Sequence, residues 1–186
     1  MYLRIEDNHI NNRKKFLNTV YDQKSDQDTK VLYREWALSY EEELIFNEYV
    51  TPSRCAEALK RYKLDNNCNI LDLGCGTGMS GQALHRVGYQ NIDGIDFSEE
   101  MLGYARDKQT YRNLWQEDLN ALAEIKTGPY EAIFAAGIIS PSHANQETID
   151  LGLSALRPNG IMVFSFNDHA LNDDIFMAKI SELKKN

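Results

Sequence analysis

The chain has 186 residues, of which 42% are hydrophobic and 26% charged, and its formal net charge is −8 at pH 7. This length suits one domain with a sizeable hydrophobic core. The acidic balance disfavours stable nucleic-acid binding, which relies on a basic surface, and favours a small-molecule substrate. No stretch approaches the apolar length of a membrane-spanning helix, so no membrane partner is expected.

The cysteines point to a reducing environment. Cys55, Cys68 and Cys75 lack the spacing of a metal site, and an odd number argues against a disulfide framework. The first residues show neither a secretory signal nor a typical transit peptide. We therefore predict a cytoplasmic protein without a metal ion.

The N-terminal part of the chain is expected to precede the sheet. Residues 1–29 are polar and poorly periodic, which is typical of a solvated leader. Residues 30–62 carry apolar side chains at helical spacing and predict two helices, the second from Ser53 to about Tyr62. This second helix should pack on the sheet.

The stretch Asn69–Asp96 is the unit around which the fold is expected to form. Asn69–Leu73 is an apolar run suited to a buried parallel strand, and a glycine-rich turn ends it. A helix from about Met79 to Val87 and a second strand, Asn91–Ile95, should follow. Ligands of an open α/β sheet bind outside the carboxyl ends of its strands, so the glycines and Asp96 should face one site.

These residues predict a cofactor that carries a nucleoside. Alternating glycines let the backbone approach a ligand closely, and the helix start after them offers free N–H groups. An acid about 20 residues further on, here Asp96, can accept both ribose hydroxyl protons.

Two different cofactors are compatible with these residues at this point. Gly76, Gly78 and Gly81 spell GxGxxG, the dinucleotide fingerprint of nicotinamide enzymes. Asp72, however, stands two residues before the first glycine, where it would repel a pyrophosphate. A carboxylate there better suits the ammonium or sulfonium end of S-adenosylmethionine.

The run LDLGCGTG, followed by GIDFSEEML, resembles motif I and its successor in class I S-adenosylmethionine-dependent methyltransferases. The resemblance implies an α/β fold in three layers with a doubly wound, mostly parallel sheet, and S-adenosylmethionine as cofactor. The residues it implies at the cofactor are Asp72, Gly74, Cys75, Gly76, Asp96, Phe97, Met101, Glu117, Asp118, Leu119, Ala135 and Ala136.

A second resemblance lies in VLYREWALSYEEEL, which is similar to the YDxWAxxYD segment of the Williams–Beuren-region methyltransferase-like family. It implies a helical lid with Tyr40 near the amino-acid end of the cofactor, and more weakly Tyr33 and Trp36. For Trp36, core packing is an equal alternative. Arg34 and Glu41 stand where the pattern has aspartates.

The remaining elements complete the predicted core, residues 63–186. Strands are expected at Tyr111–Trp115, Tyr130–Ala136 and Ile161–Phe166, with a helix from Thr148 to Leu156. No strand-rich segment follows, whereas class I folds usually end in an antiparallel hairpin, so the core is expected to be shortened at its C-terminus. The last strand would then be an exposed edge that could pair with another chain.

The loop IISPSHANQET is expected to form part of an acceptor pocket. His143 lies in it, and the ordinary pKa of histidine would suit a general base. The alternative is a solvated loop histidine without a catalytic role.

The sequence thus predicts a methyltransferase that transfers a methyl group from S-adenosylmethionine to a small molecule by in-line displacement. Such a reaction depends mainly on alignment and exclusion of water. Two alternatives stay open, a catalytically silent module that binds S-adenosylmethionine and a nicotinamide-dependent enzyme.

Overall fold

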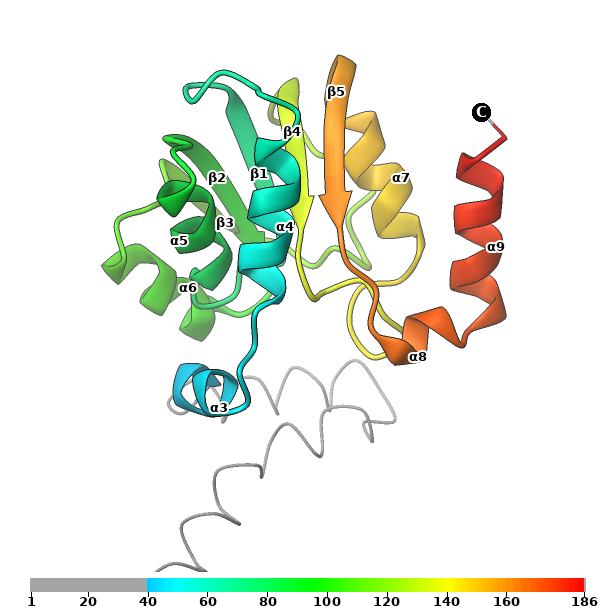
Figure 1. Cartoon of the computed structure of the whole chain (residues 1–186), viewed down its shortest axis with the longest axis horizontal. Helices are drawn as coiled ribbons and strands as arrows, with labels where there is room; N and C mark the ends of the chain where they lie inside the picture. Colours follow the sequence, from blue (N-terminus) through cyan, green and yellow to red (C-terminus); the bar gives the residue numbers. More distant parts are fainter. Residues whose placement is uncertain (1–39, 186) are drawn as a thin grey trace, which may run out of the picture.

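The computed structural model describes residues 40–185, and its centre is one parallel sheet (Figure 1). Five strands lie in the order β3-β2-β1-β4-β5, and every pairing is parallel. The strands are β1 (Asn69–Leu73), β2 (Asn91–Asp96), β3 (Asn113–Gln116), β4 (Tyr130–Ala135) and β5 (Leu156–Phe164). The order reverses between β1 and β4, so the predicted doubly wound α/β fold is confirmed.

The helices are α3 (Tyr40–Phe46), α4 (Thr51–Lys60), α5 (Met79–Arg86), α6 (Glu99–Asp107), α7 (Glu147–Ser154), α8 (Asp168–Leu171) and α9 (Asp174–Leu183). Helix α6 begins after Ser98, whose side chain caps it by accepting a hydrogen bond from the Met101 N–H at 3.2 Å. Helix α4 has Pro52 in its first turn, where a missing N–H costs no hydrogen bond.

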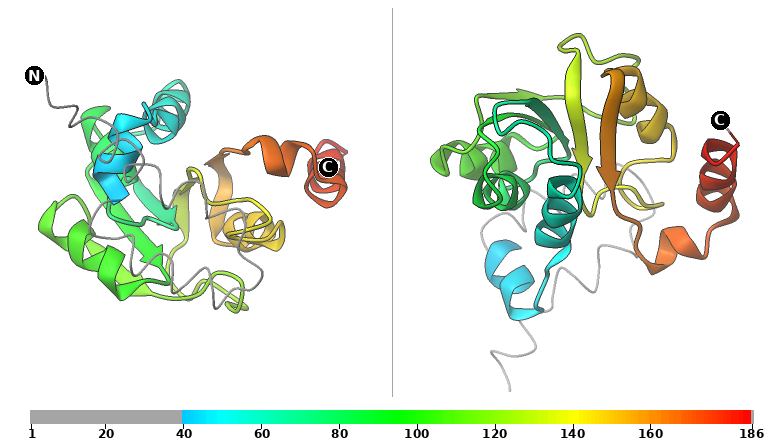
Figure 2. Two further views of the ribbon diagram at one scale, coloured as in Figure 1. Left: turned by 90° about the horizontal axis from the view of Figure 1, so that it is seen from below. Right: turned by 45° about the horizontal axis from the view of Figure 1, so that its top comes forward.

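The sheet separates two hydrophobic cores, and alternate residues of each strand face one or the other. Along β1, Ile70 packs with α4 and α5, while Leu71 and Leu73 face the opposite side. Along β4, Phe134 packs in the core with α4 and α5, and Ile133 packs in the opposite core. Figure 2 shows α4 and α5 on one side of the sheet and α7 on the other, which gives the three layers.

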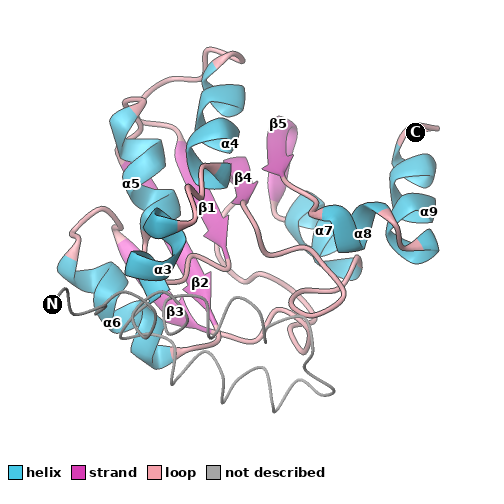
Figure 3. Cartoon of the chain, turned by 60° about the horizontal axis from the view of Figure 1, so that its bottom comes forward, coloured by secondary structure: helices cyan, strands magenta, loops and turns pink. Residues whose placement is uncertain are grey.

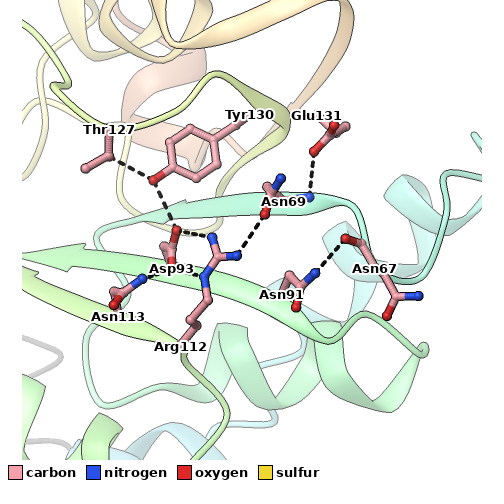
Figure 4. Close-up of polar contacts among 9 residues, drawn as sticks. All are labelled: Asn67, Asn69, Asn91, Asp93, Arg112, Asn113, Thr127, Tyr130 and Glu131. Atoms are coloured by element: carbon pink, nitrogen blue, oxygen red, sulfur yellow. Dashed lines mark hydrogen bonds and ion pairs between the residues drawn. The ribbon is translucent and has the colours of Figure 1, made fainter.

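A buried carboxylate ties the strands together at the end of the sheet away from the glycine-rich turn (Figure 4). Asp93 of β2 is only 2% exposed and accepts hydrogen bonds from Arg112 Nη2 at 2.6 Å and Arg112 Nε at 3.0 Å. Asn113 of β3 donates to it at 2.9 Å, and the hydroxyl of Tyr130 lies 3.2 Å away. The network joins β2, β3 and β4 around one charge.

The starts of two predicted strands were wrong. Strand β3 begins at Asn113, because Tyr111 turns its ring towards α5, where its hydroxyl accepts from the Gly81 N–H at 2.8 Å. Strand β5 begins at Leu156 instead of Ile161, because residues 157–160 form a bulge inside it. The bulge appears as a register shift opposite Tyr130 to Ala132, and Asn159 has a φ of 64°.

After β5, the described residues form α8 and α9 and contribute no further strand, so β5 is an edge of the described sheet. Phe176 of α9 packs edge-on against Phe166 with ring centroids 5.8 Å apart, and Lys179 pairs with Asp150 of α7 at 2.7 Å. Helix α9 therefore extends the layer of α7, and within residues 40–185 no strand pairs with the outer edge of β5.

The predicted leader, residues 1–29, and the first part of the predicted lid, with Tyr33 and Trp36, lie outside the described residues. In the described part of the chain, no helix has the length and apolar character needed to cross a bilayer.

Candidate active site

The glycine-rich turn lies at the carboxyl ends of β1 and β2 (Figure 3). Gly74, Gly76 and Gly78 have φ values of 66°, 53° and 92°, which side-chain-bearing residues rarely adopt. A Cβ added to Gly76 would meet no described atom within 4 Å, so the space beside this turn is open. The Cys75 N–H donates to Ile95 O at 2.9 Å and holds the turn against β2.

Asp96 links this turn to the start of α6. Its Oδ2 accepts from the Gly76 N–H at 2.8 Å, and its Oδ1 accepts from the Ser98 N–H at 2.9 Å. The side chain lines the cavity, as predicted, although the residue is only 6% exposed. Burial raises the pKa of Asp96 to about 6, and the backbone N–H donors oppose that rise. Three backbone N–H donors, those of Gly76, Phe97 and Ser98, leave the carboxylate one lone pair for a hydroxyl group.

Asp72 is placed behind the cavity wall. It is fully buried and is not among the residues that line the cavity. The Tyr111 hydroxyl donates to Asp72 Oδ2 at 2.7 Å, whereas Oδ1 has no hydrogen-bond partner among the described residues. Burial raises the pKa of Asp72 to about 8, and Asp96 adds to the rise. Its predicted contact with the cationic end of the cofactor stays a prediction.

Sequence reasoning missed Tyr111. The tyrosine ring fills the space that a Cβ on Gly81 would need, since that Cβ would stand 2.5 Å from Tyr111 Cζ. The one available signal was a glycine inside a helix, which indicates close packing by another group.

The ends of β2 and β3 form the next part of the wall. The Glu117 N–H donates to Asp96 O at 3.0 Å, which brings the end of β3 beside the end of β2. Asp118 Oδ1 accepts from the Asn120 N–H at 3.1 Å and so stabilises the turn that follows. The predicted residues here that line the cavity are Phe97, Met101, Glu117, Asp118 and Leu119.

The loop between β4 and α7 closes the cavity on another side. Ala136, Ile138 and His143 line it, whereas Ala135 is fully buried and faces the core beside α7. Ser140 Oγ lies 2.7 Å from His143 Nδ1, so the hydroxyl orients the imidazole.

The pKa of His143 differs from the value expected from the sequence. Burial lowers the pKa of His143 to about 4, so the ordinary pKa assumed from the sequence was wrong. The imidazole is therefore neutral at pH 7. It can accept a proton there, but it is a weaker base than an exposed histidine.

Asn120 holds this loop in place. Its Nδ2 donates to His143 O at 2.7 Å, and its Oδ1 accepts from the Asn145 N–H at 2.9 Å. Asn120 itself lines the cavity. No motif drew attention to this side chain, since its two partners follow it by more than 20 residues.

Tyr40 and Tyr49 approach the cavity from the N-terminal side. The Tyr49 hydroxyl occupies the place where a side chain on Gly137 would stand, and Gly137 has a φ of 78°. Gly137 is therefore needed for the close approach of Tyr49, which sequence reasoning missed.

Gly76, Asp96, Met101, Asn120, His143 and Tyr49 line one cavity, whose empty space is about 970 Å³ when the open solvent at its mouth is included. Among residues 40–185, no three potential metal ligands come together.

Comparison with known proteins decides the family. Residues 64–186 match the family described as a methyltransferase domain. The chain belongs to this family. S-adenosylmethionine is accordingly its methyl donor, which answers the question of cofactor that the glycine pattern left open.

The methyltransferase domain is similar to proteins with different acceptors. The trans-aconitate 2-methyltransferase of Azoarcus sp. is 35% identical over 57% of this chain and 42% of its own length. The 18S rRNA (guanine-N(7))-methyltransferase of Bos taurus is 35% identical over 40% of this chain and 26% of its own length. The chain thus spans less than half of either relative.

A solved structure supports the fold. The TehB-like S-adenosylmethionine-dependent methyltransferase of Corynebacterium glutamicum superposes with a TM-score of 0.58 and 20% sequence identity, over 82% of this chain and 81% of that one.

The described residues fit an adenosyl cofactor. The open space beside Gly76 gives room for close backbone approach, and Asp96 offers acceptors for hydroxyl groups. Behind the turn, Asp72 Oδ1 has no hydrogen-bond partner among the described residues, and a cation bound nearby would favour the ionised form of this carboxyl.

Proposed function

We propose that this methyltransferase domain methylates a small-molecule acceptor that lies between the turn at Gly76 and the loop at His143. The observation that carries the proposal is one continuous cavity among the described residues, which runs from Asp96 and Met101 to Tyr49 and His143. Its cofactor end and its far end are lined by different strand ends, so two ligands can meet inside it.

The cofactor end divides into groups of distinct chemistry. Asp96 would accept from the ribose hydroxyls, and Phe97 and Met101 would pack against the adenine ring. Asp118 would accept from the adenine amino group, with the Leu119 backbone at a ring nitrogen. The other predicted contacts are the backbone at Gly74, Cys75 and Gly76, together with Tyr40, Glu117 and Ala136. Asp72 and Ala135 were also predicted as contacts, but neither lines the cavity.

S-adenosylmethionine supplies a methyl group on a positively charged sulfonium. The chain contributes alignment of the acceptor, exclusion of water by the loops, and a place for the proton. For an oxygen acceptor, the neutral imidazole of His143 would take that proton, held in orientation by Ser140. A neutral amine or a thiolate would not need it.

The first experiment tests binding and turnover separately. Calorimetric titration with S-adenosylhomocysteine should show one site, and S-adenosylmethionine with a labelled methyl group should then label an acceptor from a panel of acids, phenols, amines and thiols. An 18S rRNA fragment belongs in the same panel. Labelling of RNA alone would overturn the small-molecule proposal, and binding without any turnover would favour the catalytically silent module.

Two narrower expectations belong to this proposal. Kinship with the Williams–Beuren-region methyltransferase-like family rests on VLYREWALSYEEEL, of which residues 31–39 lie outside the described part. A cytoplasmic location is supported by Cys55, Cys68 and Cys75, which are all free and buried thiols.

A further inference from the structure

Lys108 joins two walls of the cavity that are far apart in the sequence. It follows the last turn of α6, and its side chain is only 14% exposed. Its Nζ donates to Thr77 O in the glycine-rich turn at 2.7 Å and also forms an ion pair with Glu41 of α3. Neither the sequence motifs nor the proposed chemistry uses this lysine.

The glycine-rich turn makes room for Lys108. A Cβ on Gly78 would stand 3.2 Å from Lys108 Cδ and 3.1 Å from Ala105 Cα. Gly78 also has a φ of 92°, so its lack of a side chain serves both the backbone turn and the passage of the lysine stem.

Both partners of Lys108 adjoin residues of the cavity wall. Thr77 lines the cavity itself, and Glu41 follows Tyr40, which lines it from α3. Because the lysine is largely withdrawn from water, its bonds to the carbonyl and the carboxylate are stronger than those of an exposed ion pair. The ammonium group of Lys108 thus fixes the position of α3 relative to the glycine-rich turn.

We propose that Lys108 is a positioning residue that couples the position of α3 to the conformation of the glycine-rich turn. Cofactor binding and the placement of Tyr40 then stabilise each other. Reciprocal coupling follows, since a ligand that favours one arrangement of the turn must favour the helix position joined to it. The inference rests on S-adenosylmethionine as cofactor and goes beyond the residues that touch it.

Helix α6 offers a matched control. Arg106 pairs with Glu99 on the same helix at 2.7 Å, but both side chains are about half exposed, at 48% and 53%. Neither residue lines the cavity. Loss of this pair should leave cofactor affinity unchanged.

The test is a double-mutant cycle on the dissociation constant of S-adenosylhomocysteine. Lys108→Met keeps the stem over Gly78 and removes the charge, and Glu41→Gln removes the partner's charge. We expect Glu41→Gln to weaken binding about fivefold and Lys108→Met about tenfold or more, with the double variant no weaker than Lys108→Met. Lys108→Arg should restore most of the affinity, and Arg106→Gln should have no effect.

The outcomes separate this coupling from its alternatives. Equal weakening by Glu41→Gln in the wild-type and Lys108→Met backgrounds would overturn the coupling, as would lower melting temperatures with unchanged affinities. If Lys108→Met does not fold, the comparison of Glu41→Gln with Arg106→Gln decides: equal affinities would overturn the proposal. A wild-type protein that fails to bind S-adenosylhomocysteine would instead refute the cofactor.

Discussion

Asp96 shows how one side chain can serve both the fold and a ligand. It accepts backbone N–H groups from Gly76 and Ser98, so its carboxylate is already oriented before any ligand arrives. This preorganisation is the reason to expect a large effect from its removal.

For Asp96→Ala, we expect the binding free energy of S-adenosylhomocysteine to weaken by about 2 to 3 kcal/mol, because charge-assisted hydrogen bonds are lost. Isothermal titration calorimetry measures the change. The affinity of Asp96→Asn, which keeps one carbonyl acceptor, should lie between that of the wild type and that of Asp96→Ala. Unaltered affinity in the alanine variant would remove Asp96 from the cofactor site.

Asp72 is expected to make stability depend on pH. Because burial raises its pKa to about 8, the folded protein binds this proton more tightly than the unfolded chain does. The free energy of unfolding should therefore fall as pH rises from about 4 to about 8. Asp96 acts in the same direction up to about pH 6.

In Asp72→Asn the fall in stability between about pH 6 and pH 8 should disappear, whereas the part due to Asp96 below pH 6 should remain. We expect its melting temperature to equal that of the wild type at low pH and to exceed it by roughly 5 °C above pH 8. Differential scanning calorimetry across pH provides the measurement, and Asp107→Asn on the exposed side of α6 is the control. A wild-type curve that rises with pH over this range would contradict the argument.

His143 can be tested through turnover. If it takes a proton from an oxygen acceptor, His143→Gln should lower kcat about 100-fold while affinity for S-adenosylhomocysteine stays the same. Because burial lowers the pKa of His143 to about 4, the wild-type rate should show no loss from its protonation near pH 6.5. The exposed His85 of α5 is the matched control, and equal rates in both variants would leave His143 without a catalytic role.

At the scale of elements, the network around Asp93 joins β2 and β3 to β4, which pairs with neither of them in the sheet (Figure 4). The two partners differ in exposure, since the side chain of Asp93 is 3% exposed and that of Arg112 is 44% exposed. Water therefore screens the charge of Arg112, whereas the carboxylate of Asp93 is shielded from water.

Removing the arginine should leave this carboxylate short of donors. We expect Arg112→Met to lower the free energy of unfolding by about 2 kcal/mol, less than for a fully buried pair because water reaches the arginine. Urea denaturation measures it. The combination with Asp93→Asn should cost less than the two single changes added together, and simple additivity would show that the pair is not coupled.

The elements also show where local pattern predicts well. Strand β1, the start of α5 and the cap of α6 follow from apolar runs, glycines and a serine that act within a few residues. Strand β5 was placed less well, because the bulge at 157–160 depends on its register against β4.

At the scale of the molecule, the sequence by itself determined the parallel α/β architecture, the glycine-rich turn and the acid at the end of β2. Each of these follows from hydrophobic periodicity or backbone freedom, which are local properties. That Asp96 lines the cavity was predictable because the carboxyl ends of parallel strands share one edge of a sheet.

Only the tertiary structure decided which side chains meet at this edge. Tyr111 beneath Gly81, Tyr49 over Gly137 and Lys108 between two walls are contacts between distant parts of the chain. The direction of each side chain depends on packing against elements that the local pattern does not position. Burial likewise raises the pKa of Asp72 and lowers that of His143, because the desolvation of a charge is a property of the folded molecule.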